Sequence, residues 1–163
     1  MTIQEYNKCV DEYADRVFRF LIVQTRNKEL AKDILQDCFE KMWLKHENIQ
    51  FEKARSYLFT AAYHGIIDNY RKNNKNISLD EVSQEQVQYY HAYHHGDLKE
   101  ILEQALKTLP IVQKNVLLLR DYEGYEYKEI AEITGLSESQ VKVYIFRARM
   151  KMKEYLGKIE NIL

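Results

Sequence analysis

Apolar residues recur every three or four positions along most of this chain, the spacing that places them on one face of an α-helix. In the first part of the chain the pattern predicts three helices. The first follows a capping box that begins at Thr2, and the second is capped by Asn27. A loop over 45–50 precedes a long third helix over about 53–73.

The last part of the chain shows the same periodicity, which predicts helices over 98–109 and 111–122. Residues 126–151 then form two helices joined by a short turn, because Gly135 suits the left-handed end of a helix and Ser137 begins a capping box. This arrangement is typical of the DNA-binding helix-turn-helix, whose second helix lies in the major groove. An ordinary helical hairpin is the alternative.

Residues 76–97 break the pattern and carry four acidic residues but no lysine or arginine. They read as a polar linker. His91, His94 and His95 raise the alternative of a metal site, but neither a cysteine nor paired carboxylates lie beside them. The sequence therefore favours an ordinary linker and no bound metal.

Composition supports a helical interpretation, because the chain has one proline and five glycines among 163 residues. We predict an all-α protein of two small helical domains, 1–75 and 98–163, joined by a flexible linker over 76–97. Cys9 and Cys38 fall on apolar helix faces and are expected to be reduced core residues. Neither a signal peptide nor a membrane-length apolar run is evident, so we expect a cytoplasmic protein.

Charge is distributed unevenly although the net charge is only −1, which excludes a uniformly basic nucleic-acid coat protein. Residues 139–158 carry six lysines and arginines against one glutamate. A concentrated basic helix favours DNA as its partner and argues against a scaffold that makes only protein contacts.

Motifs on several helices occur in a fixed order along the chain. They are AKDILQDCF at 31–39, YLFTAAYHGIIDNYR at 57–71, LP at 109–110, YEGYEYKEIA at 122–131 and VKVYIFRAR at 141–149. Together they resemble the motifs of the extracytoplasmic-function sigma factors, the two-domain sigma subunits of bacterial RNA polymerase. The resemblance covers nearly the whole chain except the linker. Departures are Tyr57 for the family's Trp, Tyr63-His64 for its Arg-Asn pair, and Gln140 for a common Thr.

The second helix carries an acidic stripe whose members are three or four positions apart, so they share one face. Taken alone, such a stripe could be solvated surface. The resemblance implies that this helix docks on the basic coiled coil of the polymerase beta-prime subunit, where carboxylates guide association and an aromatic ring adds apolar contact. The predicted polymerase-binding residues are Asp33, Gln36, Asp37, Phe39 and Glu40.

Aromatic and cationic residues alternate after the second helix, as a protein that holds unpaired bases requires. Tyr57 and Phe59 could instead belong to the core. By resemblance, this edge captures the minus-10 element as a single strand, and the end of the third helix holds phosphates of the adjoining duplex. The predicted residues are Asn48, Phe51, Lys53, Arg55, Ser56, Tyr57, Phe59, Asn69, Arg71 and Lys72.

The second helix of the helix-turn-helix is expected to read the minus-35 element. Glutamine prefers adenine, lysine and arginine prefer guanine, and valine can contact a thymine methyl group. The predicted residues are Ser139, Gln140, Lys142, Val143, Arg147, Arg149 and Lys151. Arg149 and Lys151, further along the helix, are expected to contact phosphate.

No phosphate-binding glycine loop, metal-ligand spacing or activated nucleophile is evident, so we expect no enzyme activity, no cofactor and no small-molecule substrate. The resemblance implies core RNA polymerase (its beta-prime and beta subunits), promoter DNA and an anti-sigma factor, often membrane-bound, as partners. The alternatives are a helix-turn-helix regulator that never joins polymerase and a helical adaptor. The face at 33–39 distinguishes a sigma factor from the helix-turn-helix regulator, because a regulator that does not bind polymerase has no need of this face.

Overall fold

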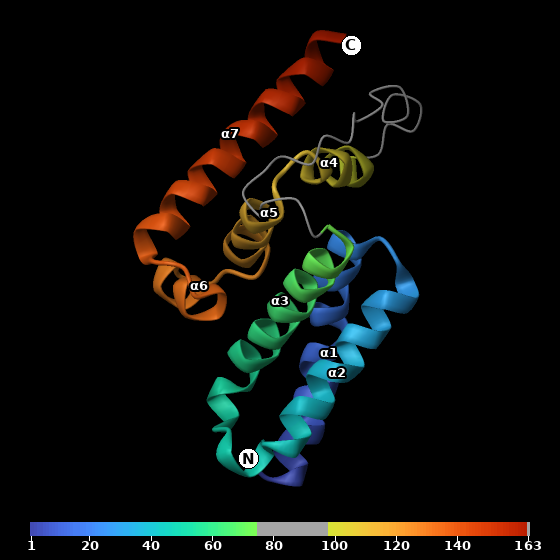
Figure 1. Cartoon of the computed structure of the whole chain (residues 1–163), viewed down its shortest axis with the longest axis vertical. Coiled ribbons are helices and arrows are strands. Elements are labelled where there is room, and N and C mark those ends of the chain that lie inside the picture. Colours follow the sequence, from blue (N-terminus) through green and yellow to red (C-terminus); the bar gives the residue numbers. More distant parts are fainter. Residues whose placement is uncertain (75–97, 163) are drawn as a thin grey trace. The chain divides into compact units, whose positions relative to one another are not determined.

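The computed structural model describes residues 1–74 and 98–162, and every regular element in these ranges is helical (Figure 1). The all-α prediction is confirmed. The described helices form two units along the chain, one before and one after the segment that was predicted to be a linker. That linker, with its three histidines, lies outside the described residues. Within the described part, no helix is long and apolar enough to cross a membrane.

Three helices pack on one another pairwise in the N-terminal unit. They are α1 (Ile3–Thr25), α2 (Lys28–Leu44) and α3 (Ala54–Asn73), with short 3-10 turns η1 (His46–Asn48) and η2 (Phe51–Lys53) between the last two. The predicted caps are present: Thr2 Oγ1 accepts a hydrogen bond from Glu5 N at 3.1 Å, and Asn27 Oδ1 accepts one from Leu30 N at 3.1 Å. Local capping therefore sets where α1 and α2 begin.

Gly65 lies at a close approach between α3 and α2. A Cβ atom at this position would be 2.7 Å from Cγ2 of Ile34. Ile34 is buried and β-branched, so its methyl group has little freedom to move aside. The glycine is therefore needed for packing, although glycine weakens a helix interior.

We expect Gly65→Ala to destabilise the N-terminal unit by about 1–2 kcal/mol, because overpacking outweighs the better helix propensity of alanine. Gly157→Ala is the matched control, because no atom lies within 4 Å of a Cβ there. It should stabilise its helix by about 0.5–1 kcal/mol. Thermal melting followed by circular dichroism measures both. A melting temperature of the Gly65 variant at or above that of the natural chain would contradict the close approach.

The C-terminal unit consists of α4 (Leu98–Lys107), α5 (Ile111–Leu117), the π-turn η3 (Leu118–Tyr122), α6 (Tyr127–Thr134) and α7 (Glu138–Ile162). The predicted helix over 111–122 is present, but its last turn widens. Glu123 N donates to Leu118 O at 3.1 Å, a bond one residue longer than in an α-helix. Asp121, whose contact with Arg149 is described below, lies in this widened turn.

Candidate polymerase and promoter interfaces

Two faces of α2 differ sharply in burial. Ala31, Ile34, Cys38 and Met42 are buried against the other two helices of the unit. Burial raises the pKa of the Cys38 thiol to about 12, so it is an uncharged core group, as expected.

The opposite face of α2 presents the predicted polymerase-binding residues. Asp33, Gln36, Asp37 and Glu40 are exposed, and Phe39 is half-buried. Lys41 Nζ lies 2.8 Å from Asp37 Oδ2, and this hydrogen bond raises the pKa of Lys41. This face therefore carries three carboxylates against Lys32 and Lys41, and Asp37 is already paired to Lys41 on the same helix.

This face continues into an aromatic cluster that the sequence analysis did not single out. The Tyr6 hydroxyl donates to Phe39 O at 3.0 Å, and its ring meets Trp43 edge-on with centroids 5.0 Å apart. Trp43 stacks on His46 at 4.5 Å and remains 40% exposed. The signal that could have revealed it is the spacing of four residues between Phe39 and Trp43, which puts both on one face.

Most of the predicted minus-10 residues are accessible. Asn48 and Lys53 are exposed in the turns between α2 and α3, whereas Phe51, Arg55, Ser56 and Tyr57 are half-buried. At the other end of α3, Arg71 and Lys72 are exposed and Asn69 is half-buried. These residues thus form two groups at the two ends of one helix.

Phe59 is the exception, and its predicted contact with DNA is wrong. Its side chain is 0% exposed, and its ring packs edge-on against Phe20 with centroids 5.4 Å apart. Leu58 and Ala62 on the same helix are also fully buried. Phe59 belongs to the core, the alternative that its sequence context had left open, and no base can reach its faces.

The helix-turn-helix has the predicted local geometry. Gly135 adopts a φ of 75°, which only glycine takes without strain. Ser137 Oγ accepts from Gln140 N at 3.1 Å, and Gln140 Oε1 accepts from Ser137 N at 2.9 Å, which completes the capping box. Beyond the cap, Val141 and Ile145 are buried and fix the orientation of α7.

One exposed face of α7 collects most of the predicted minus-35 residues. Ser139, Gln140, Val143 and Arg147, together with Tyr144, line a shallow hollow of about 230 Å³. The ammonium group of Lys142, on a neighbouring side of the helix, lies 5.8 Å from the centroid of the Tyr127 ring. Lys151 is half-buried further along α7.

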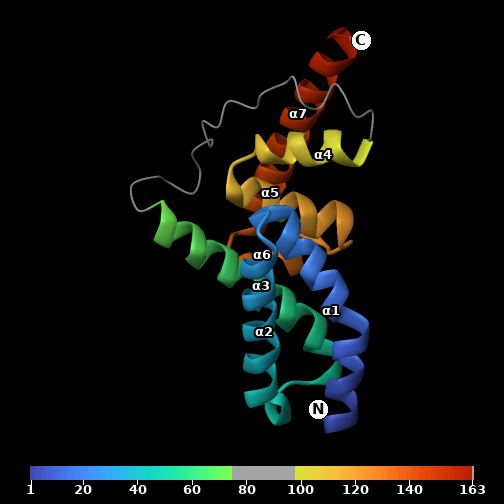
Figure 2. The same cartoon turned by 90° about the vertical axis from the view of Figure 1, so that its right-hand side faces the viewer.

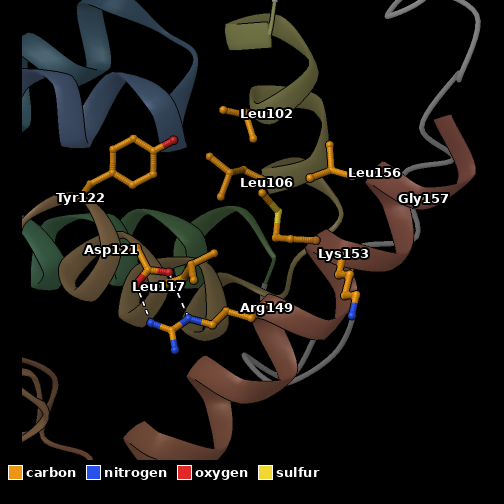
Figure 3. Close-up of a pocket in the computed structure, with 10 residues that line it drawn as sticks. Leu102, Leu106, Leu117, Asp121, Tyr122, Arg149, Lys153, Leu156 and Gly157 are labelled. Carbon is orange, nitrogen blue, oxygen red and sulfur yellow. Dashed lines mark hydrogen bonds and ion pairs between the residues drawn. The ribbon is translucent and has the colours of Figure 1, made fainter. Parts of the chain in front are cut away.

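The structure corrects the prediction for Arg149. Its guanidinium group forms two hydrogen bonds with the Asp121 carboxylate, at 3.1 and 2.5 Å, and these raise its pKa (Figure 3). Arg149 lies on the side of α7 that faces the rest of its unit, as do Ile145 and Met152, and not on the side of Val143. The pair links α7 to η3 and already neutralises the charge of Arg149, although its side chain remains 48% exposed.

A groove beside this ion pair was also absent from the sequence analysis. It has a volume of about 520 Å³ and lies between α4, the end of α5 with η3, and α7 (Figure 3). Its lining is largely apolar and consists of Leu102, Leu106, Leu117, Asp121, Tyr122, Arg149, Met152, Lys153, Leu156 and Gly157. Tyr122 is 61% exposed at this groove. The groove is a tertiary feature, because three separate helical segments form its walls.

The geometry defines a helix-turn-helix protein with a second helical unit that carries its own acidic and aromatic face. Comparison with known proteins identifies the family within this class. Residues 9–76 match the sigma-70 region 2 family, and residues 99–152 match the sigma-70 region 4 family. The chain is 31% identical over 158 residues to the ECF RNA polymerase sigma factor SigM of Bacillus subtilis (strain 168), covering 94% of each chain.

A second similar protein is also an RNA polymerase sigma factor. The RNA polymerase sigma factor YlaC of the same organism is 31% identical, with 90% of this chain and 89% of YlaC covered. The fold is similar to that of the sigma factor RpoE from Bartonella quintana, solved with the anti-sigma factor NepR, with a TM-score of 0.74, 22% identity, and 95% and 98% of the two chains covered. The chain belongs to the extracytoplasmic-function sigma factors of the sigma-70 family, the non-catalytic subunits that direct transcription initiation by RNA polymerase.

Proposed function

We propose that this sigma factor docks on the beta-prime coiled coil of core polymerase through the exposed face of α2. The observation that carries the proposal is the separation of α2 into a buried apolar face and a continuous exposed one. Asp33, Asp37 and Glu40 supply negative charge for a basic partner, and Phe39 supplies apolar contact. A duplex-binding regulator would have no use for this arrangement.

The minus-10 element is held as a single strand by the turns between α2 and α3. Phe51 and Tyr57 are half-buried aromatic rings, the kind of surface on which unpaired bases stack. Lys53 and Arg55 add positive charge beside them. Asn69, Arg71 and Lys72, at the far end of α3, hold phosphates of the adjoining duplex.

The minus-35 element is read by the exposed face of α7, with Ser139, Gln140, Val143 and Arg147 at base edges. Lys142 and Lys151 add positive charge for the phosphates on either side. Arg149 is not part of the proposed site, because its guanidinium group is held by Asp121.

The groove of the C-terminal unit provides a second polymerase contact, with the beta subunit. Its leucine and methionine walls suit a short apolar segment, and Tyr122 adds an aromatic edge. An anti-sigma factor, often membrane-bound, would restrain the protein by covering these polymerase-facing surfaces. The similar fold of a sigma factor solved with NepR supports such a partner. The family implies that all of this takes place in the cytoplasm.

Reconstitution with core polymerase tests the proposal. The purified chain should co-purify with core enzyme and direct transcription that depends on both promoter elements. If the chain binds duplex DNA but does not associate with core enzyme, it acts as the two-domain regulator instead.

We expect Arg147→Ala and Lys151→Ala to weaken minus-35 binding in different ways. Arg147→Ala should cost about 1–3 kcal/mol and relax the preference for one base pair. Lys151→Ala should weaken binding to all sequences and reduce the slope of log affinity against log salt by about 0.9. Titrations of duplex promoter fragments at several salt concentrations separate these effects. Equal, sequence-independent losses for both variants would contradict the assignment.

A further inference from the structure

The first turns of α1 lie against the connection between α2 and α3, in the proposed minus-10 site (Figure 2). The amino group of Met1 donates hydrogen bonds to the carbonyl oxygens of His46 and Ile49, at 2.6 and 2.8 Å. Two turns along α1, Lys8 Nζ lies 5.4 Å from the centroid of the Phe51 ring. The sequence predicts no role in DNA binding for α1. This helix nevertheless borders the connection that is predicted to hold the single strand.

We propose that Lys8 contacts the opened DNA strand, its ammonium group pairing with the phosphate of the nucleotide whose base stacks on Phe51. The proposal rests on the minus-10 function proposed above and deepens it. The site then has three sides: the turns between α2 and α3, the start of α3, and α1.

The geometry fits the chemistry of single-strand binding, which combines an aromatic ring for the base with a cation for the backbone. Phe51 is half-buried and Lys8 is exposed, so the pair is accessible from solvent. The flexible four-carbon stem of lysine allows its ammonium group to leave the ring and reach a phosphate at the ring's edge. A base can then take the exposed part of the ring.

The charged residues around Phe51 explain why the cation of Lys8 is useful at this site. Glu47 and Glu52 are exposed in the same connection and repel a phosphate backbone. Glu5 lies three positions before Lys8 on α1, but its carboxylate is engaged in the capping box, where it accepts a hydrogen bond from Thr2 N. Lys8 adds to the positive charge of Lys53 and Arg55, which together offset the two carboxylates of the connection.

The test compares Lys8→Gln, which removes the charge, with Lys8→Arg, which keeps it. Lys28→Gln is the matched control, because Lys28 is exposed at the start of α2, at the end of the unit opposite the connection (Figures 1 and 2). Each variant is assembled with core polymerase and titrated with a fork-junction promoter whose minus-10 element is single-stranded. Lys8→Gln should lower affinity about three- to tenfold and reduce the salt slope by about 0.7, the value for one phosphate of a single strand. Lys8→Arg and Lys28→Gln should match the natural chain.

Neutral methylphosphonate linkages, placed one at a time along the single strand, locate the contact. At one position the substitution should remove the difference between the natural holoenzyme and the Lys8→Gln variant. The inference is overturned if Lys8→Gln has no effect, if Lys28→Gln has an equal effect, or if Lys8→Gln instead lowers affinity for core polymerase. Failure of the natural holoenzyme to bind the fork junction would be a different result, because it would refute the minus-10 function itself.

Discussion

Exchanging two carboxylates of α2 for lysine should detach this sigma factor from RNA polymerase. Asp33→Lys combined with Glu40→Lys leaves the buried face of the helix untouched, because both residues are exposed. Placing two cations against a basic partner costs several kcal/mol, so affinity for core enzyme should fall by at least about a hundredfold. Equilibrium titration of a labelled chain with core polymerase measures the loss.

The same change of charge elsewhere in the unit is the control. Asp11→Lys with Glu12→Lys alters two exposed residues of α1 by an identical amount. If this pair weakens binding as strongly as the α2 pair, the effect reflects total charge and not a docking face. If neither pair weakens it, polymerase binds a different surface. Circular dichroism of all variants checks that the helices remain intact.

Phe59→Ala should be among the most destabilising single substitutions in the N-terminal unit. The ring is fully buried and packs edge-on against Phe20, so truncation leaves a large cavity and should cost about 3–5 kcal/mol. That cost is a large part of the 5–15 kcal/mol that holds a typical domain folded. Loss of promoter opening in this variant would therefore follow from unfolding.

Trp43 offers a direct measurement, because it is the chain's one tryptophan and lies in the N-terminal unit. Urea unfolding followed by its fluorescence reports the stability of this unit without a signal from the helix-turn-helix. Tyr57→Ala is the matched comparison: its half-exposed ring should cost less than about 1.5 kcal/mol but weaken capture of the single strand. A stable Phe59→Ala variant that binds the fork junction poorly would restore Phe59 to the DNA site.

Local chemistry explains why so much of the fold could be predicted from the sequence. The caps at Thr2, Asn27 and Ser137 and the left-handed Gly135 each depend on residues only a few positions apart. Helical periodicity then indicates which side of each helix is buried. The exposed faces of α2 and α7 were predicted on the same grounds.

Contacts between distant residues explain the errors. Arg149 looked like one more cation on a basic helix, and only its bond to Asp121, 28 positions earlier, shows that its exposed guanidinium group is held by η3. Phe59 lies beside aromatic neighbours that do reach solvent, and its burial depends on Phe20 of another helix. The groove of the C-terminal unit likewise requires three helical segments to be packed before it exists.

The capping bond of Gln140 has a consequence for which bases α7 can distinguish. Recognition of adenine by glutamine needs the amide oxygen as an acceptor and the amide nitrogen as a donor at the same time. In this structure the Gln140 oxygen already accepts a hydrogen bond from Ser137 N, which holds the amide plane in the orientation of the capping box. A second lone pair of the oxygen remains for a base, but the amide can turn toward adenine only as far as the capping bond permits. Any adenine contact that needs a larger rotation would break the cap, and the promoter would have to supply the free energy that the cap gives to the start of α7.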